Sequence, residues 1–81
     1  MTKVRNRAVV SAWAENRAAE SHTGALSTDG VSLFSYNLMI ADTAGGKKVL
    51  KDYTANGTFG FQSQTTSCHV GLARLHADVI L

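Results

Sequence analysis

Apolar and polar residues alternate along several short segments of the chain, which is the pattern of half-buried β-strands. The clearest case is residues 31–41, in which every second residue is large and mostly apolar: Phe34, Tyr36, Leu38 and Ile40. We therefore expect this segment to be the central strand of a sheet. Residues 19–27 and 47–54 show weaker alternation and are expected to add further strands.

Turn-forming residues separate these segments. Asp29-Gly30 tolerates positive φ at both positions of a tight two-residue turn, so it predicts a β-hairpin. Gly45-Gly46 and Asn56-Gly57 predict two further turns. Strands joined in this way would form a small antiparallel sheet of about four strands.

The first segment, residues 4–14, fits two structures. Alternation places Arg5, Arg7 and Trp13 on one face, which favours a strand. Its richness in alanine favours a helix instead. Strand is the first interpretation, and the choice between strand and helix stays open at this point.

The C-terminal end has the pattern of an amphipathic helix. Hydroxyl residues between 63 and 67 are suited to cap a helix that starts at about residue 66 and runs to the C-terminus. On a helical wheel the residues divide into a polar stripe of Ser67, Gly71, Arg74 and Asp78 and an opposite apolar stripe of Cys68, Leu72, Leu75 and Val79. We expect the apolar stripe to pack on the sheet, which gives an α+β fold.

The length of the chain predicts a single domain over residues 1–81, because a chain of this size can bury one compact core. Cys68 is the only cysteine and cannot close an intrachain disulfide, so stability is expected from core packing, a partner or homodimerisation. The lone thiol and an N-terminus unlike a secretory signal predict a cytoplasmic protein. No segment approaches the roughly 20 apolar residues of a membrane span, so no membrane role is expected.

Positive charge gathers at the N-terminal end, although the net charge of the whole chain is only +2. Lys3, Arg5 and Arg7 have no acidic residue among them. With Arg17 and Trp13 they combine phosphate-binding cations and a stacking ring, as surfaces for single-stranded nucleic acid do. The competing interpretation is a solvated segment with a buried tryptophan. Exposed Tyr36 and Tyr53 would extend the stacking surface, whereas aromatic residues in a strand are more often core.

The histidines and the cysteine are the side chains best suited to metal binding or nucleophilic chemistry. His69 and His76 lie seven residues apart and project on the same side of the expected helix. Ligands that share an ion on one helix are usually three or four residues apart, so we expect interface or structural histidines rather than a metal site completed by His22. Adjacent Cys68 and His69 point about 100° apart on a helix and form no nucleophile–base pair.

No catalytic residue, metal or cofactor is therefore predicted, and the chain is expected to be a non-enzymatic binding protein. The candidate binding residues are Arg5, Arg7, Trp13, Tyr36, Tyr53, His69 and His76.

Short sequence motifs in the second half of the chain add a resemblance. Ser35-Tyr36 followed by Ile40-Ala41, and Thr65-Thr66-Ser67-x-His69-Val70, resemble small accessory proteins encoded by bacteriophages. The resemblance implies a protein that binds and blocks host machinery inside the host cell, and anti-CRISPR proteins are the best-known group of this size without enzyme motifs. The implied partner is a host protein complex such as a CRISPR–Cas effector. The alternative, from the basic N-terminal segment, is a small nucleic-acid-binding protein.

Overall fold

A computed structural model describes residues 3–55 and 57–81 of the chain. The described elements follow in the order β1 (Lys3–Val4), α1 (Asn6–Ala14), β2 (Ala18–Ser21), β3 (Leu26–Asp29), β4 (Leu33–Ser35), β5 (Leu38–Ala44), β6 (Lys47–Leu50), α2 (Gln64–Arg74) and β7 (Val79–Ile80). The predicted α+β class is confirmed. The sheet is larger than predicted, because it has seven strands instead of about four, and a second helix is present.

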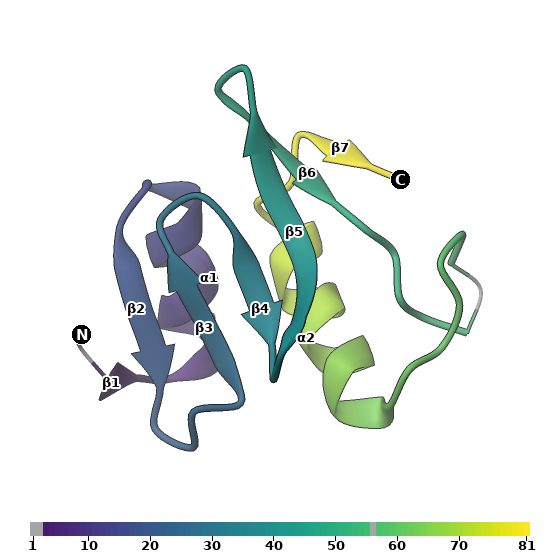
Figure 1. The fold of residues 1–81 in the computed structure, drawn as a ribbon, viewed down its shortest axis with the longest axis horizontal. Helices are drawn as coiled ribbons and strands as arrows, with labels where there is room; N and C mark the ends of the chain where they lie inside the picture. The colour runs from purple at the N-terminus through teal and green to yellow at the C-terminus, as the bar shows by residue number, and fades with distance from the viewer. Residues whose placement is uncertain (1–2, 56) are drawn as a thin grey trace.

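The strands lie side by side in the same order as they occur in the chain (Figure 1). β2 to β6 pair antiparallel with one another, whereas β1 pairs parallel with β2 and β7 pairs parallel with β6. A parallel pair requires a crossover connection, and the two helices supply the two crossovers. The predicted purely antiparallel sheet is therefore wrong at both edges.

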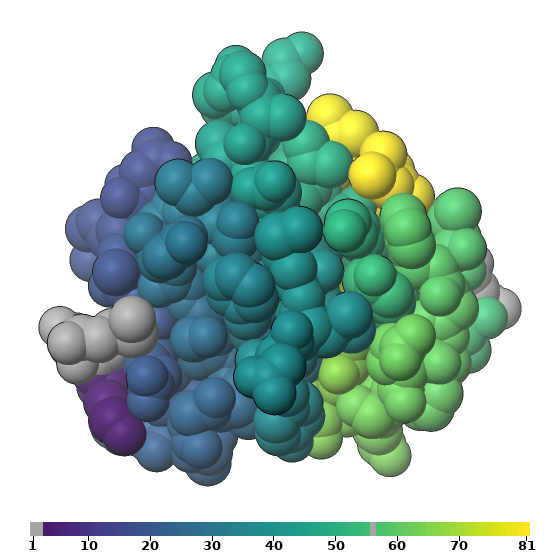
Figure 2. Space-filling view, viewed as in Figure 1, coloured from purple at the N-terminus to yellow at the C-terminus, as the bar shows by residue number. Residues whose placement is uncertain are grey.

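Both helices cover the same face of the sheet. β2 and β6 run in the same direction, since four antiparallel steps separate them, and both crossovers step toward β7. Crossovers between parallel strands are almost always right-handed, which puts α1 and α2 on one side. In Figure 1 both helices lie behind the sheet, and the space-filling view from the same side shows β3 to β5 forming the middle of the open face (Figure 2).

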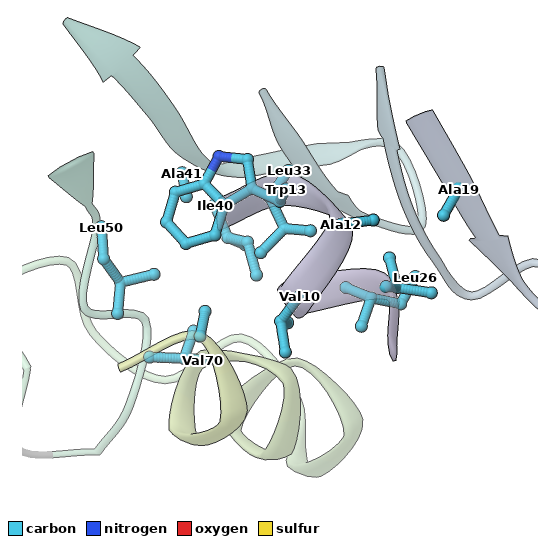
Figure 3. Close-up of a cluster of buried hydrophobic side chains, with 12 residues drawn as sticks. Val10, Ala12, Trp13, Ala19, Leu26, Leu33, Ile40, Ala41, Leu50 and Val70 are labelled. Atoms are coloured by element: carbon cyan, nitrogen blue, oxygen red, sulfur yellow. The ribbon is translucent and has the colours of Figure 1, made fainter. Parts of the chain in front are cut away.

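The hydrophobic core lies between this sheet and the two helices. Figure 3 shows side chains from α1, α2 and the strands converging there, among them Trp13, Leu50 and Val70. A β-bulge adds to the core in β5: Leu33 pairs with Ala41 while Phe34 pairs with Met39, so Ile40 has no partner on β4. The bulge turns the consecutive residues Ile40 and Ala41 both inward, and both are fully buried.

The first interpretation of residues 4–14 as a strand is wrong, because Asn6–Ala14 form a helix. In a strand, Val9 and Val10 would point to opposite faces. Both are buried, together with Trp13 three residues further on, which is the spacing of one helical face.

The predicted central strand over residues 31–41 is also wrong, because the chain reverses at Tyr36-Asn37 and Ser35 pairs with Leu38. Tyr36 has φ of 57° and its N–H donates to the carbonyl oxygen of Ala25 at 2.7 Å. A side chain other than glycine in this conformation costs about 1–3 kcal/mol. The sequence pattern pointed to one long strand because no glycine marks this turn.

Two of the predicted turns are present in the structure, one of them with a longer loop than predicted. The hairpin at Asp29-Gly30 is confirmed, but Thr28 pairs with Leu33, so its loop has four residues instead of two. The Gly45-Gly46 turn is confirmed, with φ of 59° and 81°. Residues 19–27 form two strands instead of one, since a turn separates Ser21 from Leu26. Asn56 of the third predicted turn, Asn56-Gly57, lies outside the described residues.

In the loop between β3 and β4, the Asp29 carboxylate accepts hydrogen bonds from the N–H groups of Val31 and Ser32 at 2.9 and 2.8 Å. The Ser32 and Val31 N–H groups hold the pKa of this carboxyl below its ordinary value. These two bonds stabilise the four-residue loop in place of a tight turn.

The C-terminal helix is shorter and rotated compared with the prediction. Ser63 caps it as predicted by accepting the N–H of Thr66, but the helix ends at Arg74 and the chain returns to the sheet as β7. The predicted apolar stripe is wrong, since Cys68 is exposed and Leu75 is 81% exposed. The buried face consists of Thr66, His69, Val70 and Ala73.

Candidate functional site

A groove of about 470 Å³ lies between α1 and β2. Its floor consists of small apolar side chains, and arginines stand at its sides. The residues that line it are Val4, Arg5, Arg7, Ala8, Ser11, Ala12, Arg17, Ala18 and Ala19. We call this the arginine groove. It exists because α1 buries its opposite side in the core and presents small residues toward β2.

Three cations and no acid line the arginine groove. Arg5 and Arg7 lie at the start of α1 and Arg17 lies beyond its end, so the charges flank a nine-residue helix roughly 13 Å long. Arg17 is paired with Glu15, with its Nε 3.0 Å from the carboxylate oxygen. Among the ion pairs of the described residues, Arg5 and Arg7 take part in none. These two guanidinium groups are the ones available to an anionic partner.

Trp13 does not join the arginines at the surface. Its ring is fully buried in the core, and its Nε1 donates to the carbonyl oxygen of Val31 at 3.0 Å. A ring in this place cannot stack on a base, so the structure separates the basic residues from the aromatic residue proposed to act with them.

The two tyrosines proposed for binding lie apart from each other in the fold. Tyr36 is exposed in the β4–β5 turn. Tyr53 is half-buried after β6 and stacks obliquely on Phe59, with 5.2 Å between ring centroids. The structure therefore does not gather the aromatic candidates into one stacking surface.

The three histidines occupy different environments. His69 is buried on α2, His76 is half-buried beyond the end of α2, and His22 is exposed in the turn after β2. Among residues 3–55 and 57–81, no three His, Cys, Asp or Glu side chains come together in a way that could hold a metal ion. Figure 1 shows the turn after β2 and the helix α2 on different parts of the molecule.

A chain of hydroxyl groups connects buried His69 to the start of α2. Ser63 Oγ donates to Thr66 Oγ1 at 3.1 Å, Thr66 Oγ1 lies 3.0 Å from Ser35 Oγ, and Ser35 Oγ lies 2.7 Å from Nδ1 of His69. Since each hydroxyl has one proton to donate, a consistent direction runs from Ser63 to an unprotonated Nδ1. We call Ser63, Thr66, Ser35 and His69 the hydroxyl relay. It joins α2 to β4 with polar groups that are satisfied inside the protein.

The hydroxyl relay contains a serine–histidine contact, and hydrolases use such a contact as a nucleophile–base pair. Ser35 and His69 are both almost completely buried, and no carboxylate of the described residues is hydrogen-bonded to His69 to orient it as a base. The Ser35 hydroxyl is also hydrogen-bonded to Thr66 Oγ1, at 3.0 Å. The contact therefore accounts for the attachment of α2 to the sheet.

Burial lowers the pKa of His69, so its imidazole is neutral at pH 7. In the unfolded chain the same imidazole takes up a proton near pH 6.5, whereas in the folded protein it does not until lower pH. We therefore expect the free energy of unfolding to be highest above pH 6.5 and to fall as the pH is lowered through 6.5 toward the folded pKa. Urea denaturation at a series of pH values between 5 and 8 measures this.

A matched pair of variants isolates His69 in this experiment. Asparagine at position 69 keeps an acceptor near the Nδ1 position and removes the titration, so His69→Asn should flatten the pH dependence. His22→Asn, in an exposed turn, serves as the control and should keep the wild-type profile. Equal pH profiles for wild type and His69→Asn would contradict the assignment.

A second polar network surrounds Lys48. Its Nζ donates to Thr43 Oγ1 at 2.7 Å and to Asn16 Oδ1 at 2.8 Å, and lies 5.3 Å from the centroid of the Trp13 ring. Burial lowers the pKa of Lys48, and the charge of Asp78 opposes that change. The network connects the end of α1 to β5 and β6, so it is part of the fold and faces no groove.

Sequence reasoning found Arg5 and Arg7, noted Arg17 only as one basic residue among several, and missed the hydroxyl relay. The relay has a weak signal in the sequence, because Ser35 shares a strand face with Leu33 and is thus a polar residue at a core position. Such a residue requires a buried hydrogen-bond partner, which Thr66 and His69 provide.

Comparisons with protein-family models, with curated proteins and with solved structures find no match to this chain. No helix formed by the described residues is long and apolar enough to cross a bilayer. Function is therefore inferred from the geometry of the chain itself.

Proposed function

We propose that this chain is a non-enzymatic binding protein that holds an acidic segment of a partner protein in the arginine groove. The observation that supports this most directly is the combination of an apolar floor with Arg5 and Arg7, which take part in no ion pair of the described residues. Opposite charges across an interface guide the encounter and set the orientation of the partner.

The floor of the groove favours a protein over a nucleic acid as the occupant. Val4 and the alanines of α1 and β2 offer apolar contact, which a small side chain of a peptide segment satisfies. A single-stranded nucleic acid would bring phosphates to the arginines, but surfaces that bind it usually add an aromatic ring on which its bases stack. No aromatic residue lines the groove, and Trp13 is buried.

The resemblance to small bacteriophage accessory proteins guides the choice of partner. On that resemblance the partner is a host protein complex that the chain blocks by occupying one of its surfaces, and a CRISPR–Cas effector is the first to test. Blocking by mimicry of DNA is disfavoured, because the chain has six acidic residues against eight Lys and Arg.

Reversing the two available charges should remove binding. We expect Arg5→Glu/Arg7→Glu to weaken the complex by about tenfold or more, since each 1.4 kcal/mol lost is a factor of ten. Both positions are exposed at the start of α1, where acidic side chains are favourable, so the variant should fold. The measurement is quantitative mass spectrometry of proteins retained from a bacterial lysate, followed by titration with the purified partner.

Lys47→Glu is the matched control, because Lys47 is exposed at the start of β6 and does not line the groove. It should bind like wild type. A complex that survives the double reversal would overturn the role of the groove. Binding of single-stranded oligonucleotide that weakens steeply with added salt, without a protein partner, would replace this proposal by the nucleic-acid alternative.

A further inference from the structure

A second hollow, of about 450 Å³, shares no lining residue with the arginine groove. It is formed where the β4–β5 turn meets the segment that leads into α2, at the lower end of the view in Figure 1. The residues that line it are Ser35, Tyr36, Asn37, Leu38, Gln62, Ser63 and Thr66. We call this the turn hollow. It is a shallow hollow, widely open to solvent.

The lining of the turn hollow combines uncharged polar groups with apolar surface and carries no charge. Six of its seven lining side chains carry a hydroxyl or an amide group, and none carries a charge. An ionised ligand would lose hydration here without gaining a counter-ion, so the lining selects against it. A neutral ligand with many hydroxyl groups would find donors and acceptors along the side that faces the protein, because hydroxyl and amide groups offer both.

Tyr36 supplies a flat apolar surface at the edge of the hollow. Its side chain is 58% exposed although the ring is large and mostly apolar, and its backbone has a φ that glycine adopts far more easily. Glycine or asparagine would suit the turn better. The strained residue therefore holds an aromatic face beside Asn37 and Gln62 and contributes nothing to the core.

The far end of the hollow is rigid. Ser63 and Thr66 belong to the hydroxyl relay, and Ser63 also caps α2. Thr66 is 3% exposed and is hydrogen-bonded to Ser35 behind it. Hydroxyls held in this way need little further ordering when a ligand binds.

The geometry points to a binding site for a neutral saccharide in the turn hollow. The apolar face of a sugar ring would lie on the Tyr36 ring, and its hydroxyls would exchange hydrogen bonds with the side-chain amides of Asn37 and Gln62 and with Ser63. A neutral sugar matches each property of the lining: one aromatic face, several uncharged donors and acceptors, and no counter-ion. The site is separate from the arginine groove, so it does not depend on the function proposed for that groove.

The test is an NMR titration of the ¹⁵N-labelled chain with a panel of neutral sugars: glucose, galactose, mannose, N-acetylglucosamine and their disaccharides. We expect at least one sugar to shift the amide signals of residues 35–38 and 62–66 with an affinity in the millimolar range. The glucuronate anion, of similar size, should shift these signals less than glucose does.

Two variants of matched exposure make the result specific. Tyr36→Gly removes the ring and relieves the positive φ, so it folds, and it should lose at least tenfold in affinity. Phe61→Ala removes a ring that is 56% exposed but does not line the hollow, and it should bind as wild type does. No shift with any sugar, equal shifts in Tyr36→Gly, or stronger binding of glucuronate than of glucose would each overturn the inference.

Discussion

Replacing Trp13 with alanine is expected to lower the free energy of unfolding by about 3–5 kcal/mol. The ring is fully buried between α1 and the sheet (Figure 3), so its removal leaves a cavity. The Val31 carbonyl oxygen loses the hydrogen bond from Nε1 and keeps the one from Thr43 Oγ1. The free energy of unfolding of a domain is typically about 5–15 kcal/mol, so this substitution removes a large part of it. Urea denaturation followed by far-UV circular dichroism is the measurement, because the variant has no tryptophan left to report by fluorescence.

Trp13→Phe is the graded control for this prediction. It retains a buried aromatic ring and loses the Nε1 hydrogen bond to Val31, so its loss of stability should lie between those of wild type and Trp13→Ala. If Trp13→Ala changed the free energy of unfolding by less than about 0.5 kcal/mol, as exposed positions do, the position of this ring in the core would be refuted.

Replacing Lys48 with methionine is expected to cost about 2–4 kcal/mol of stability, although the side chains are similar in length. Methionine cannot donate to Thr43 Oγ1 and Asn16 Oδ1, so the substitution removes both hydrogen bonds of the buried Lys48 ammonium group to β5 and to the end of α1. Thermal and urea denaturation measure the loss.

Lys47→Met provides the comparison, since Lys47 is the exposed neighbour of Lys48 in the same strand. It should change the free energy of unfolding by less than about 0.5 kcal/mol. Equal stability of the two variants would show that the bonds of the Lys48 ammonium group contribute nothing to the fold.

The α+β class and the glycine turns could be predicted from the sequence because their signals are local. Gly45-Gly46 adopts positive φ that few other residues accept, so its turn is visible without any tertiary contact. The helix at residues 6–14 was also visible in part. Val9 and Val10 are adjacent apolar residues, which a half-buried strand cannot turn inward together and a helix can.

The Tyr36-Asn37 turn could not be predicted from local signals. Tyrosine has a high strand propensity and an unfavourable energy at positive φ, so the local sequence argues for continuing the strand. The turn is fixed by tertiary contacts instead, such as the hydrogen bond from the Tyr36 N–H to Ala25. The apparent alternation across residues 31–41 is the sum of two shorter strands with a bulge in the second.

The candidate site also combines features that have a local sequence signal with features that arise only from long-range contacts. Arg5 and Arg7 are close in sequence, so their cluster of charge could be recognised directly, whereas Arg17 reaches the groove only because α1 folds back along β2. The hydroxyl relay joins Ser35 to Thr66 and His69 across more than thirty residues. Contacts of that separation leave no periodic trace in one sequence, and a buried serine is the only indication of them.

The linear strand order has a consequence for how the chain reaches this structure. Every strand is hydrogen-bonded only to strands that neighbour it in the chain, so the contact order of the sheet is low for a β-rich protein. Four consecutive hairpin pairings connect β2 to β6, and each closes over a short loop at small cost in chain entropy. The longest connection between paired strands runs from Leu50 to Val79, so we expect α2 to dock on the sheet, through Ser35 and His69, after the hairpins have paired.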